Sequence, residues 1–248
     1  MKKFLGYLIT PVVTIIFILL LVIFQPIQWI SFRFFGYGVH KRSVDILNLL
    51  LLRTIYLLGD TVNFINEQNL PLGRPIIFLA NHQCLMDIPP MIWYLRNYHA
   101  KFISKIELTK GIPSISYNLK HGGGANINRK DARQSITELL KLGNRMKENN
   151  WSAVIFPEGT RSTDGTIKTF QAAGVATILK KCPNALLVPI AIKNSWKLVK
   201  YGVYPLNTFT YISWEVLKPI EPANRPVDEL VMEAENSIRV ALAQPSST

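Results

Sequence analysis

Residues 76–87 read Ile-Ile-Phe-Leu-Ala-Asn-His-Gln-Cys-Leu-Met-Asp. The apolar run with β-branched and aromatic members predicts a buried strand, and polar residues begin where this strand ends. Asp87 is followed by Pro89, Pro90 and a second apolar run. This order is typical of a helix start with a carboxylate at the N-cap and proline in the first turn. The pattern therefore places His82 and Asp87 on one strand-to-helix turn.

His82 and Asp87 have the chemistry of a general-base pair. A carboxylate bound to one ring nitrogen fixes the tautomer of an imidazole and stabilises the imidazolium that forms when the ring takes a proton. The intervening turn is long enough for Asp87 to fold back onto His82. A structural histidine beside an unrelated helix cap fits the same two positions, so this stretch alone leaves both interpretations open.

A second stretch, residues 154–161, reads Val-Ile-Phe-Pro-Glu-Gly-Thr-Arg and again runs from an apolar strand into a polar loop. In an open α/β sheet the ligand site lies at the carboxyl ends of the strands. Gly159 lets the backbone turn or approach a ligand, and the planar fork of Arg161 suits phosphate. The alternative is that Glu158 and Arg161 simply pair with each other in a solvated loop.

The two stretches in this order resemble the glycerolipid acyltransferase family, and within it the 1-acylglycerol-3-phosphate (lysophosphatidic acid) acyltransferases. The residues that carry the resemblance are 81–87 and 156–161. Residues 105–129 are similar to the second motif of the family, and residues 187–190 are similar to the fourth. One departure is Ser116, which stands where the family usually has glycine, and it bears on the local backbone and the acyl-chain pocket.

The resemblance implies acyl transfer without a metal, a cofactor or a covalent acyl-enzyme. His82 would take the proton of the sn-2 hydroxyl of lysophosphatidic acid while that oxygen attacks the thioester of acyl-CoA or acyl carrier protein, and Asp87 would orient the ring. Backbone N–H groups in the turn after His82 would bind the oxyanion. The substrate-binding residues that the resemblance implies are Glu158, Gly159, Thr160, Arg161, Lys105 and Arg129.

Lys105 and Arg129 each follow a short apolar strand. We expect the strands to bring both side chains to the edge of the sheet that holds His82 and Arg161. Single basic residues at strand ends are usually only solvated, so a phosphate-binding role for each remains a hypothesis. Cys84 lies inside the same turn, where a small apolar filler is a commoner role for an isolated cysteine than a nucleophile.

The composition indicates a membrane relationship. The chain has 248 residues, is 48% hydrophobic and carries a formal net charge of +12. Such a charge suits a polyanionic partner, either nucleic acid or anionic lipid, and the apolar N-terminus favours lipid. Two cysteines exclude a disulfide framework, and no spacing suggests zinc. We expect lysophospholipid, acyl thioester and membrane lipids as partners, with no nucleic acid.

The N-terminal segment contains two apolar stretches. No charged residue occurs from 4 to 32, and residues 44–65 read as a second, largely apolar helix. The two helices would form a hairpin that either crosses the bilayer or enters one leaflet, as members of the resembled family can. The alternative for 44–65 is a core helix of the globular domain. We place a membrane-associated segment at 1–66, the catalytic domain at 67–248, and the protein at the cytoplasmic face of a bacterial inner membrane.

Beyond residue 70 apolar strands alternate with helical segments. Strands are expected at 76–79, 101–104, 125–128, 153–156, 185–192 and 209–216, and helices at 88–97, 130–149, 170–181 and 227–243. This alternation predicts an α/β fold with a mostly parallel sheet flanked by helices.

Other functions remain as alternatives. Within the same fold the acceptor would be a lyso-ornithine lipid, another lysophospholipid or glycerol 3-phosphate. A non-catalytic basic protein of the membrane surface explains the charge and the N-terminus, but it gives no reason for the polar residues at the strand ends. A lipid esterase would need a Gly-x-Ser-x-Gly elbow, which the sequence lacks.

Overall fold

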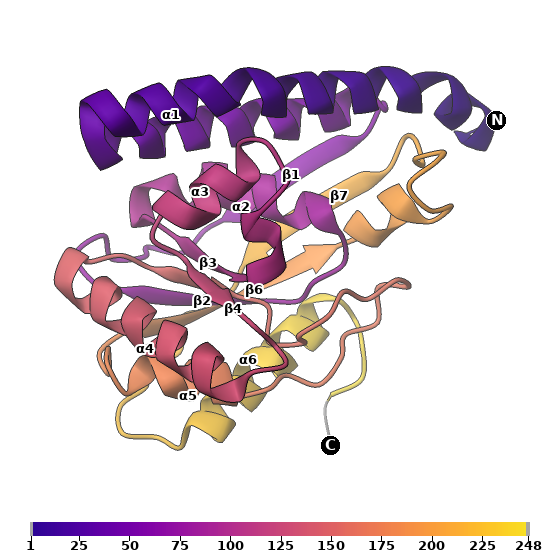
Figure 1. The fold of residues 1–248 in the computed structure, drawn as a ribbon. Helices are drawn as coiled ribbons and strands as arrows, with labels where there is room; N and C mark the ends of the chain where they lie inside the picture. The colour runs from indigo at the N-terminus through magenta and orange to yellow at the C-terminus, as the bar shows by residue number, and fades with distance from the viewer. Residues whose placement is uncertain (1, 247–248) are drawn as a thin grey trace.

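A computed structural model of the chain describes residues 2–246. These residues form a seven-stranded sheet in the order β1-β7-β6-β2-β5-β3-β4 (Figure 1). The strands are β1 (Thr61–Asn66), β2 (Ile76–Ala80), β3 (Lys101–Lys105), β4 (Ala125–Ile127), β5 (Ala153–Ile155), β6 (Leu186–Lys193) and β7 (Tyr211–Val216). The strands from β6 to β4 run parallel, and β7 joins them antiparallel to β6. The prediction of a mostly parallel α/β sheet is confirmed.

Helices cover both faces of the sheet. The helices are α1 (Lys2–Tyr56), α2 (Ile88–Tyr94), α3 (Ile115–His121), α4 (Ala132–Asn149), α5 (Ala173–Leu179) and α6 (Val227–Ala241). In Figure 1, α4, α5 and α6 lie below the sheet, while α2, α3 and α1 lie above it. Strand β2 is buried along its whole length, because Ile77 and Leu79 pack toward one helical layer and Ile76 and Phe78 toward the other.

The sheet register aligns the ends of the central strands. Leu79 of β2 pairs with Ile155 of β5 on one side and with Pro189 of β6 on the other. The polar residues that follow β2 and β5 therefore leave the sheet at the same edge, as the carboxyl ends of parallel strands must. This register places the two motif loops side by side.

Helix α1 is a hairpin of two arms. The chain turns at Gly36, whose φ of 77° and ψ of −173° lie outside the helical range and favour glycine. Leu21 on the first arm packs against Leu47 and Leu51 on the second. The predicted pair of N-terminal helices is present, and it lies across the top of the domain (Figure 1).

The hairpin is attached to the domain at its open end. Thr208 donates to the carbonyl of Lys2 at 3.1 Å, and the amide of Phe209 donates to the carbonyl of Leu58 at 3.1 Å. At the other end the Lys101 ammonium donates to the Tyr37 hydroxyl, next to the Gly36 turn. The hairpin therefore runs along the sheet domain instead of projecting from it.

The second predicted helix was too long. The helix ends at Tyr56, and Thr61–Asn66 forms the edge strand β1, which pairs parallel to β7. Gly59, with φ of 74°, lies between the two elements, and a Cβ there would clash with the ring of Phe209. The sheet therefore begins before residue 66. Helix α3 also lies in a region where the sequence pattern predicted no helix.

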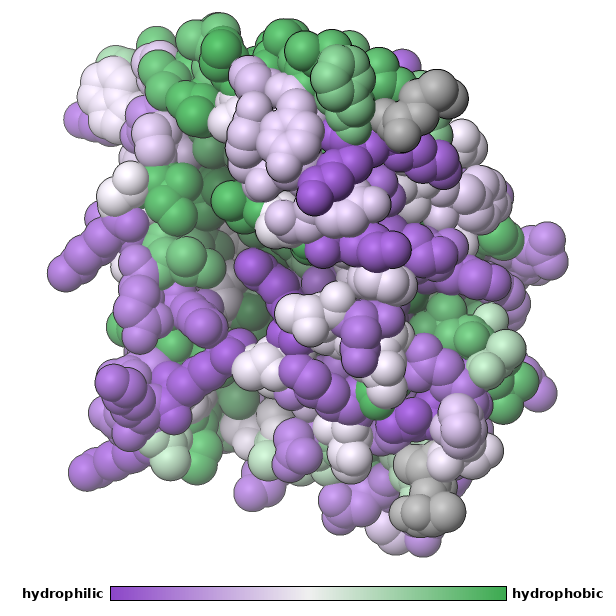
Figure 2. All heavy atoms as spheres, turned by 90° about the vertical axis from the view of Figure 1, so that its right-hand side faces the viewer, coloured by the Kyte–Doolittle hydropathy of each residue, from purple (hydrophilic) through white to green (hydrophobic). Residues whose placement is uncertain are grey.

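The outer face of the hairpin is apolar. Figure 2 shows hydrophobic side chains gathered along the top of the molecule, over α1, with hydrophilic side chains below them. The most exposed large apolar side chains of the hairpin include Phe4, Leu8, Ile15, Phe34 and Phe35. By length and composition α1 is apolar enough to cross a membrane. This exposed apolar surface indicates membrane association.

Candidate active site

The predicted pair of His82 and Asp87 forms. His82 follows the buried strand β2, and the short helix η1 (Leu85–Asp87) turns the chain so that Nδ1 of His82 lies 2.8 Å from Oδ2 of Asp87. The His82 ring stacks on Phe156 with ring centroids 4.0 Å apart. The side chain of Asp87 is fully buried, whereas that of His82 remains 13% exposed. The imidazole is thus held on one side and open to solvent on another.

Asp87 does not act as the predicted helix cap. Its side chain makes no capping bond to α2. Instead, Oδ2 also accepts the backbone N–H groups of Gln83 at 2.6 Å and Cys84 at 2.9 Å, and Ser195 donates to Oδ1. A buried carboxylate with this many donors has one fixed orientation. The carboxylate therefore holds both the turn and the His82 ring.

Glu158 joins the two motif loops. Its buried carboxylate accepts the backbone N–H of His82 at 2.7 Å and that of Lys168 at 3.1 Å. The amide of Ser162 donates to the carbonyl of His82 at 2.8 Å, so the backbone of His82 is held from both sides. Glu158 makes no ion pair with Arg161 among the described residues, and the alternative of a simple Glu–Arg pair is wrong.

Burial raises the pKa of Glu158 to about 7, although the two backbone N–H donors oppose the shift. An ionised carboxylate is disfavoured when it leaves water. Near neutral pH both the charged and the neutral form of this carboxyl group are therefore populated.

Arg161 lies beside the His82 ring. Its Nε is 3.4 Å from Nε2 of His82, on the ring nitrogen that does not contact Asp87. Lys168 holds the loop in place by donating to the hydroxyl of Thr160 and to the carbonyl of Arg161, each at 2.8 Å. Gly159 has φ of 71° and no neighbour that a Cβ would meet, so glycine is required here for the turn.

Lys105 and Arg129 lie at the same edge of the sheet but farther away. Lys105 ends β3, which is separated from β2 by β5, and Arg129 follows β4, the next strand outward. With strands about 4.8 Å apart, these backbone positions lie roughly 10 and 15 Å from β2. Both side chains are exposed and make no hydrogen bond or ion pair with any residue in 2–246. Of these three basic residues, Arg161 is therefore the one that contacts the His82 ring.

Sequence reasoning missed three side chains that support the site. Asn81 exchanges two hydrogen bonds with the backbone of Ile192, which ties the end of β2 to β6. Ser195 lies within hydrogen-bond distance of both Asp87 and Gln83. Lys168 holds the second motif loop. Ser195 could have been identified from the sequence, because it follows the apolar strand β6. The other candidates were identified in this way, as polar residues just after an apolar strand.

The turn after His82 cannot supply all of the expected oxyanion donors. The backbone N–H groups of Gln83 and Cys84 are both used by Asp87. Burial, together with Asp87, raises the pKa of the Cys84 thiol, which disfavours the thiolate that a nucleophile needs. Cys84 is therefore a buried filler.

Ser116, the departure from the family pattern, has a defined contact. Its hydroxyl donates to the carbonyl of Leu108 at 2.9 Å and fastens the start of α3. The strained position is Ser114, with φ of 60°. Ser114 is held there because its hydroxyl donates to the carbonyl of Leu21 and its amide donates to the side chain of Gln25. These bonds dock the hairpin on α3.

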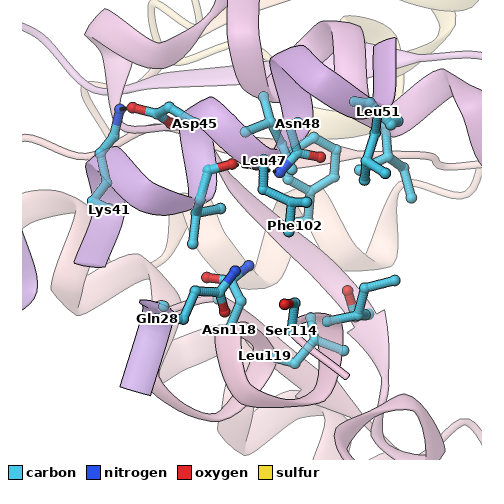
Figure 3. A pocket seen from close by; sticks show the side chains of 18 of the residues that line it. Gln28, Lys41, Asp45, Leu47, Asn48, Leu51, Phe102, Ser114, Asn118 and Leu119 are labelled. Carbon is cyan, nitrogen blue, oxygen red and sulfur yellow. Dashed lines mark hydrogen bonds and ion pairs between the residues drawn. The ribbon is translucent and has the colours of Figure 1, made fainter. Parts of the chain in front are cut away.

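A cavity adjoins this site between the hairpin, α2, α3 and β3 (Figure 3). Its volume is about 1230 Å³, open space at its mouth included. Leu85 and Met86, from the turn after His82, line it together with Phe102 of β3. Phe102 contacts Phe156, which stacks on His82. The ring of Phe156 therefore lies between the cavity wall at Phe102 and the His82 ring.

A sequence model described as Acyltransferase matches residues 61–193, the part of the chain that contains both motif loops. The chain belongs to the acyltransferase family.

This acyltransferase is similar to several proteins named 1-acyl-sn-glycerol-3-phosphate acyltransferase. LPAT1 of Arabidopsis thaliana is 29% identical over 71% of this chain and 48% of its own length. BAT2 of Brassica napus is 31% identical over 69% and 48%. The protein of Saccharomyces cerevisiae is 29% identical over 82% and 61%. The chain thus spans about half the length of the plant relatives.

The crystal structure of the 1-acyl-sn-glycerophosphate (LPA) acyltransferase PlsC from Thermotoga maritima superposes with a TM-score of 0.77. The similarity covers 97% of this chain and 96% of that one, at 23% sequence identity. The two proteins therefore share the whole fold, including the N-terminal hairpin region.

Proposed function

We propose that the protein transfers a fatty acyl group from acyl-CoA or acyl carrier protein to the sn-2 hydroxyl of lysophosphatidic acid, and so makes phosphatidic acid. The observation that carries the proposal is the arrangement of one ring: His82 binds Asp87 through Nδ1 and faces Arg161 with Nε2. A base and a phosphate-binding cation thus meet at one point. Family membership and the names of the relatives support the same reaction.

His82 acts as the general base. Nε2 accepts the proton of the acceptor hydroxyl as that oxygen attacks the thioester carbonyl, and Asp87 stabilises the imidazolium that results. When the tetrahedral intermediate collapses, the C–S bond breaks and the proton leaves with the thiolate as free thiol. General-base assistance contributes roughly 10²- to 10⁴-fold in rate. Positioning of the two substrates supplies much of the remaining rate enhancement.

Arg161 holds the phosphate of the acceptor. A phosphate offers several strong acceptor oxygens, so it competes well for the guanidinium donors that contact His82 in the free protein. Moving Arg161 onto the phosphate uncovers Nε2 for the hydroxyl. Gly159 and Thr160 shape this loop, and Glu158 positions the backbone of His82. Lys105 and Arg129 extend the cationic edge toward the anionic groups of either substrate.

The cavity beside Phe156 receives an acyl chain, and the hairpin lies in one leaflet of the membrane. Because both ends of the hairpin are fastened to the domain, its apolar face is presented sideways to the lipid. Basic side chains such as Lys3 and Arg33 flank this face and suit anionic headgroups. The protein would work at the cytoplasmic face of a bacterial inner membrane, where the acyl thioesters occur.

The test is a panel of acceptors with the full-length protein in mixed micelles. Lysophosphatidic acid, glycerol 3-phosphate, a lyso-ornithine lipid and other lysophospholipids are each supplied with acyl-CoA or acyl carrier protein thioester. Free thiol and the acylated product are then measured. Phosphatidic acid should form fastest. Faster acylation of another acceptor would reassign the substrate, and thiol release from none would favour a non-catalytic protein of the membrane surface.

A further inference from the structure

Two buried polar side chains that line the cavity lack a hydrogen bond of good geometry. Gln28 on the first arm of the hairpin and His40 on the second both have 0% of their surface exposed. Neither the amide of Gln28 nor either ring nitrogen of His40 makes a hydrogen bond of good geometry with any residue in 2–246. The polar groups that approach the His40 ring are the backbone of Gln28 and the side chain of Asn118. Both residues line the cavity. Buried polar groups are normally paired, so each of these needs an explanation.

The surroundings of this pair are mostly apolar. The cavity wall includes Phe17, Val44, Leu47, Leu51 and Phe102. Figure 3 shows Gln28 beside Asn118, with Asn48 facing them across the cavity. An alkyl chain placed here would leave the unpaired atoms unsatisfied. An occupant that offers a donor and an acceptor would satisfy them.

The charged groups of the cavity already have partners. Lys41 pairs with Asp45 at 2.6 Å, and the ammonium of Lys101 donates to the Tyr37 hydroxyl. Burial lowers the pKa of His40, so its ring is neutral near pH 7 and offers one donor and one acceptor. Gln28 offers the same two functions. A neutral hydroxyl matches both side chains better than a carboxylate or an ammonium.

We propose that Gln28 and His40 form a polar subsite that selects an acyl chain carrying a hydroxyl group. The inference rests on the proposed acyl transfer and adds a specificity to it. The hydroxylated chain belongs either to the acyl donor or to the lysolipid acceptor, since the cavity adjoins the position where both substrates meet. The two hydrogen bonds would form only when the hydroxyl lies at the depth of the hairpin.

The first experiment uses the wild-type protein. Acyl-CoA donors of one chain length are compared, with the hydroxyl at successive carbons or absent, on an unmodified lysophosphatidic acid. The roles are then exchanged, with hydroxylated lysophosphatidic acid and plain acyl-CoA. We expect one positional isomer in one arm to exceed the plain chain in kcat/KM by at least about tenfold. Equal use of plain and hydroxylated chains in both arms would overturn the inference and leave the proposed function intact.

The second experiment uses variants. Gln28→Leu and His40→Phe should each lower the preference ratio, the kcat/KM for the hydroxylated chain divided by that for the plain chain, toward one. Leu119→Met, at another position on the cavity wall, is the matched control and should keep the ratio. A wild-type preference that survives both polar variants would show that other residues cause it.

Binding separates this inference from the proposed function. If no acyl transfer to lysophosphatidic acid is detected, the proposed function fails, and the cavity is tested by displacement of a fluorescent fatty acid from the full-length protein. A hydroxylated fatty acid that displaces the probe at a concentration about tenfold lower than its plain counterpart would support the subsite. Displacement at equal concentrations would overturn it.

Discussion

The Nε atom of Arg161 lies 3.4 Å from Nε2 of His82, on the side of the ring away from Asp87. Arginine can only donate, so Nε2 is the acceptor in this contact. A neutral ring with its proton on Nδ1, toward Asp87, fits this geometry, and it is the tautomer that a general base requires. Arg161, the proposed phosphate-binding residue, therefore contacts Nε2 of His82, the atom proposed to take the proton.

Replacing Arg161 with alanine should chiefly weaken binding of the acceptor. A lost hydrogen bond to a charged group is worth about 1.5–3 kcal/mol, so KM for lysophosphatidic acid should rise roughly 10- to 100-fold while kcat changes less. Steady-state kinetics with each substrate varied in turn measure this. Lys105→Ala, at a cation two strands away, is the control and should have a smaller effect. An increase confined to KM for the acyl donor would assign Arg161 to the other substrate.

Replacing Ser195 with alanine should disturb the base through Asp87. The change removes the donor to Oδ1 and leaves the buried carboxylate less well fixed. We expect Tm to fall by about 3–10 °C and kcat to fall about tenfold. Ser237→Ala, at a half-buried position of α6 where the hydroxyl donates only to the carbonyl of Glu233 within the same helix, is the control. Unchanged kcat and Tm would mean that the orientation of Asp87 does not depend on Ser195.

The raised pKa of Glu158 predicts that the stability of the fold depends on pH. Burial raises its pKa in the folded protein from 4.5 to about 7. A raised pKa means that the protonated carboxyl favours the fold, so its contribution is complete below about pH 4.5 and is lost as the pH rises through about 7. The change amounts to at most about 3 kcal/mol. Glu158→Gln should therefore lose less stability than the wild type between these pH values, as measured by Tm in detergent. Parallel Tm profiles would contradict this assignment.

The tip of the hairpin should contribute to membrane binding. Phe34 and Phe35 are 66% and 67% exposed. Burying a phenylalanine in an apolar phase is worth about 1.5–3 kcal/mol. Replacing both with serine should weaken co-sedimentation with anionic phospholipid vesicles at least about tenfold without changing Tm. Met232→Ser on α6, on the other side of the sheet, should leave vesicle binding unchanged. Equal loss in both variants would exclude a specific role for the hairpin tip.

The parts of the fold that the sequence predicted are those with strong local patterns. Strand β2 is a continuous apolar run that ends in polar residues, and such a run identifies both a buried strand and the edge where its ligands lie. Strand β1 was missed because it follows an apolar helix directly. In β1 exposed residues alternate with partly buried ones, and this pattern is weaker than the helical pattern of the residues before it.

The contacts within the site were less predictable than its residues. His82 and Asp87 are neighbours in the chain, and a turn suffices to join them. The bonds from Glu158 to His82 and from Ser195 to Asp87 cross between strands and depend on the sheet order, which no local pattern encodes. Gln28 lies within the uncharged stretch 4–32, which predicts a membrane-associated helix, so no local pattern in the sequence indicated that its side chain is buried in a cavity.

The most direct test of the account is the rate of thiol release by His82→Ala with lysophosphatidic acid and acyl-CoA. The wild type should release thiol and form phosphatidic acid in equal amounts. The variant should be slower by roughly 10²- to 10⁴-fold, with Tm and vesicle binding close to those of the wild type. A folded His82→Ala variant that forms phosphatidic acid at the wild-type rate would contradict the central claim that this imidazole is the base.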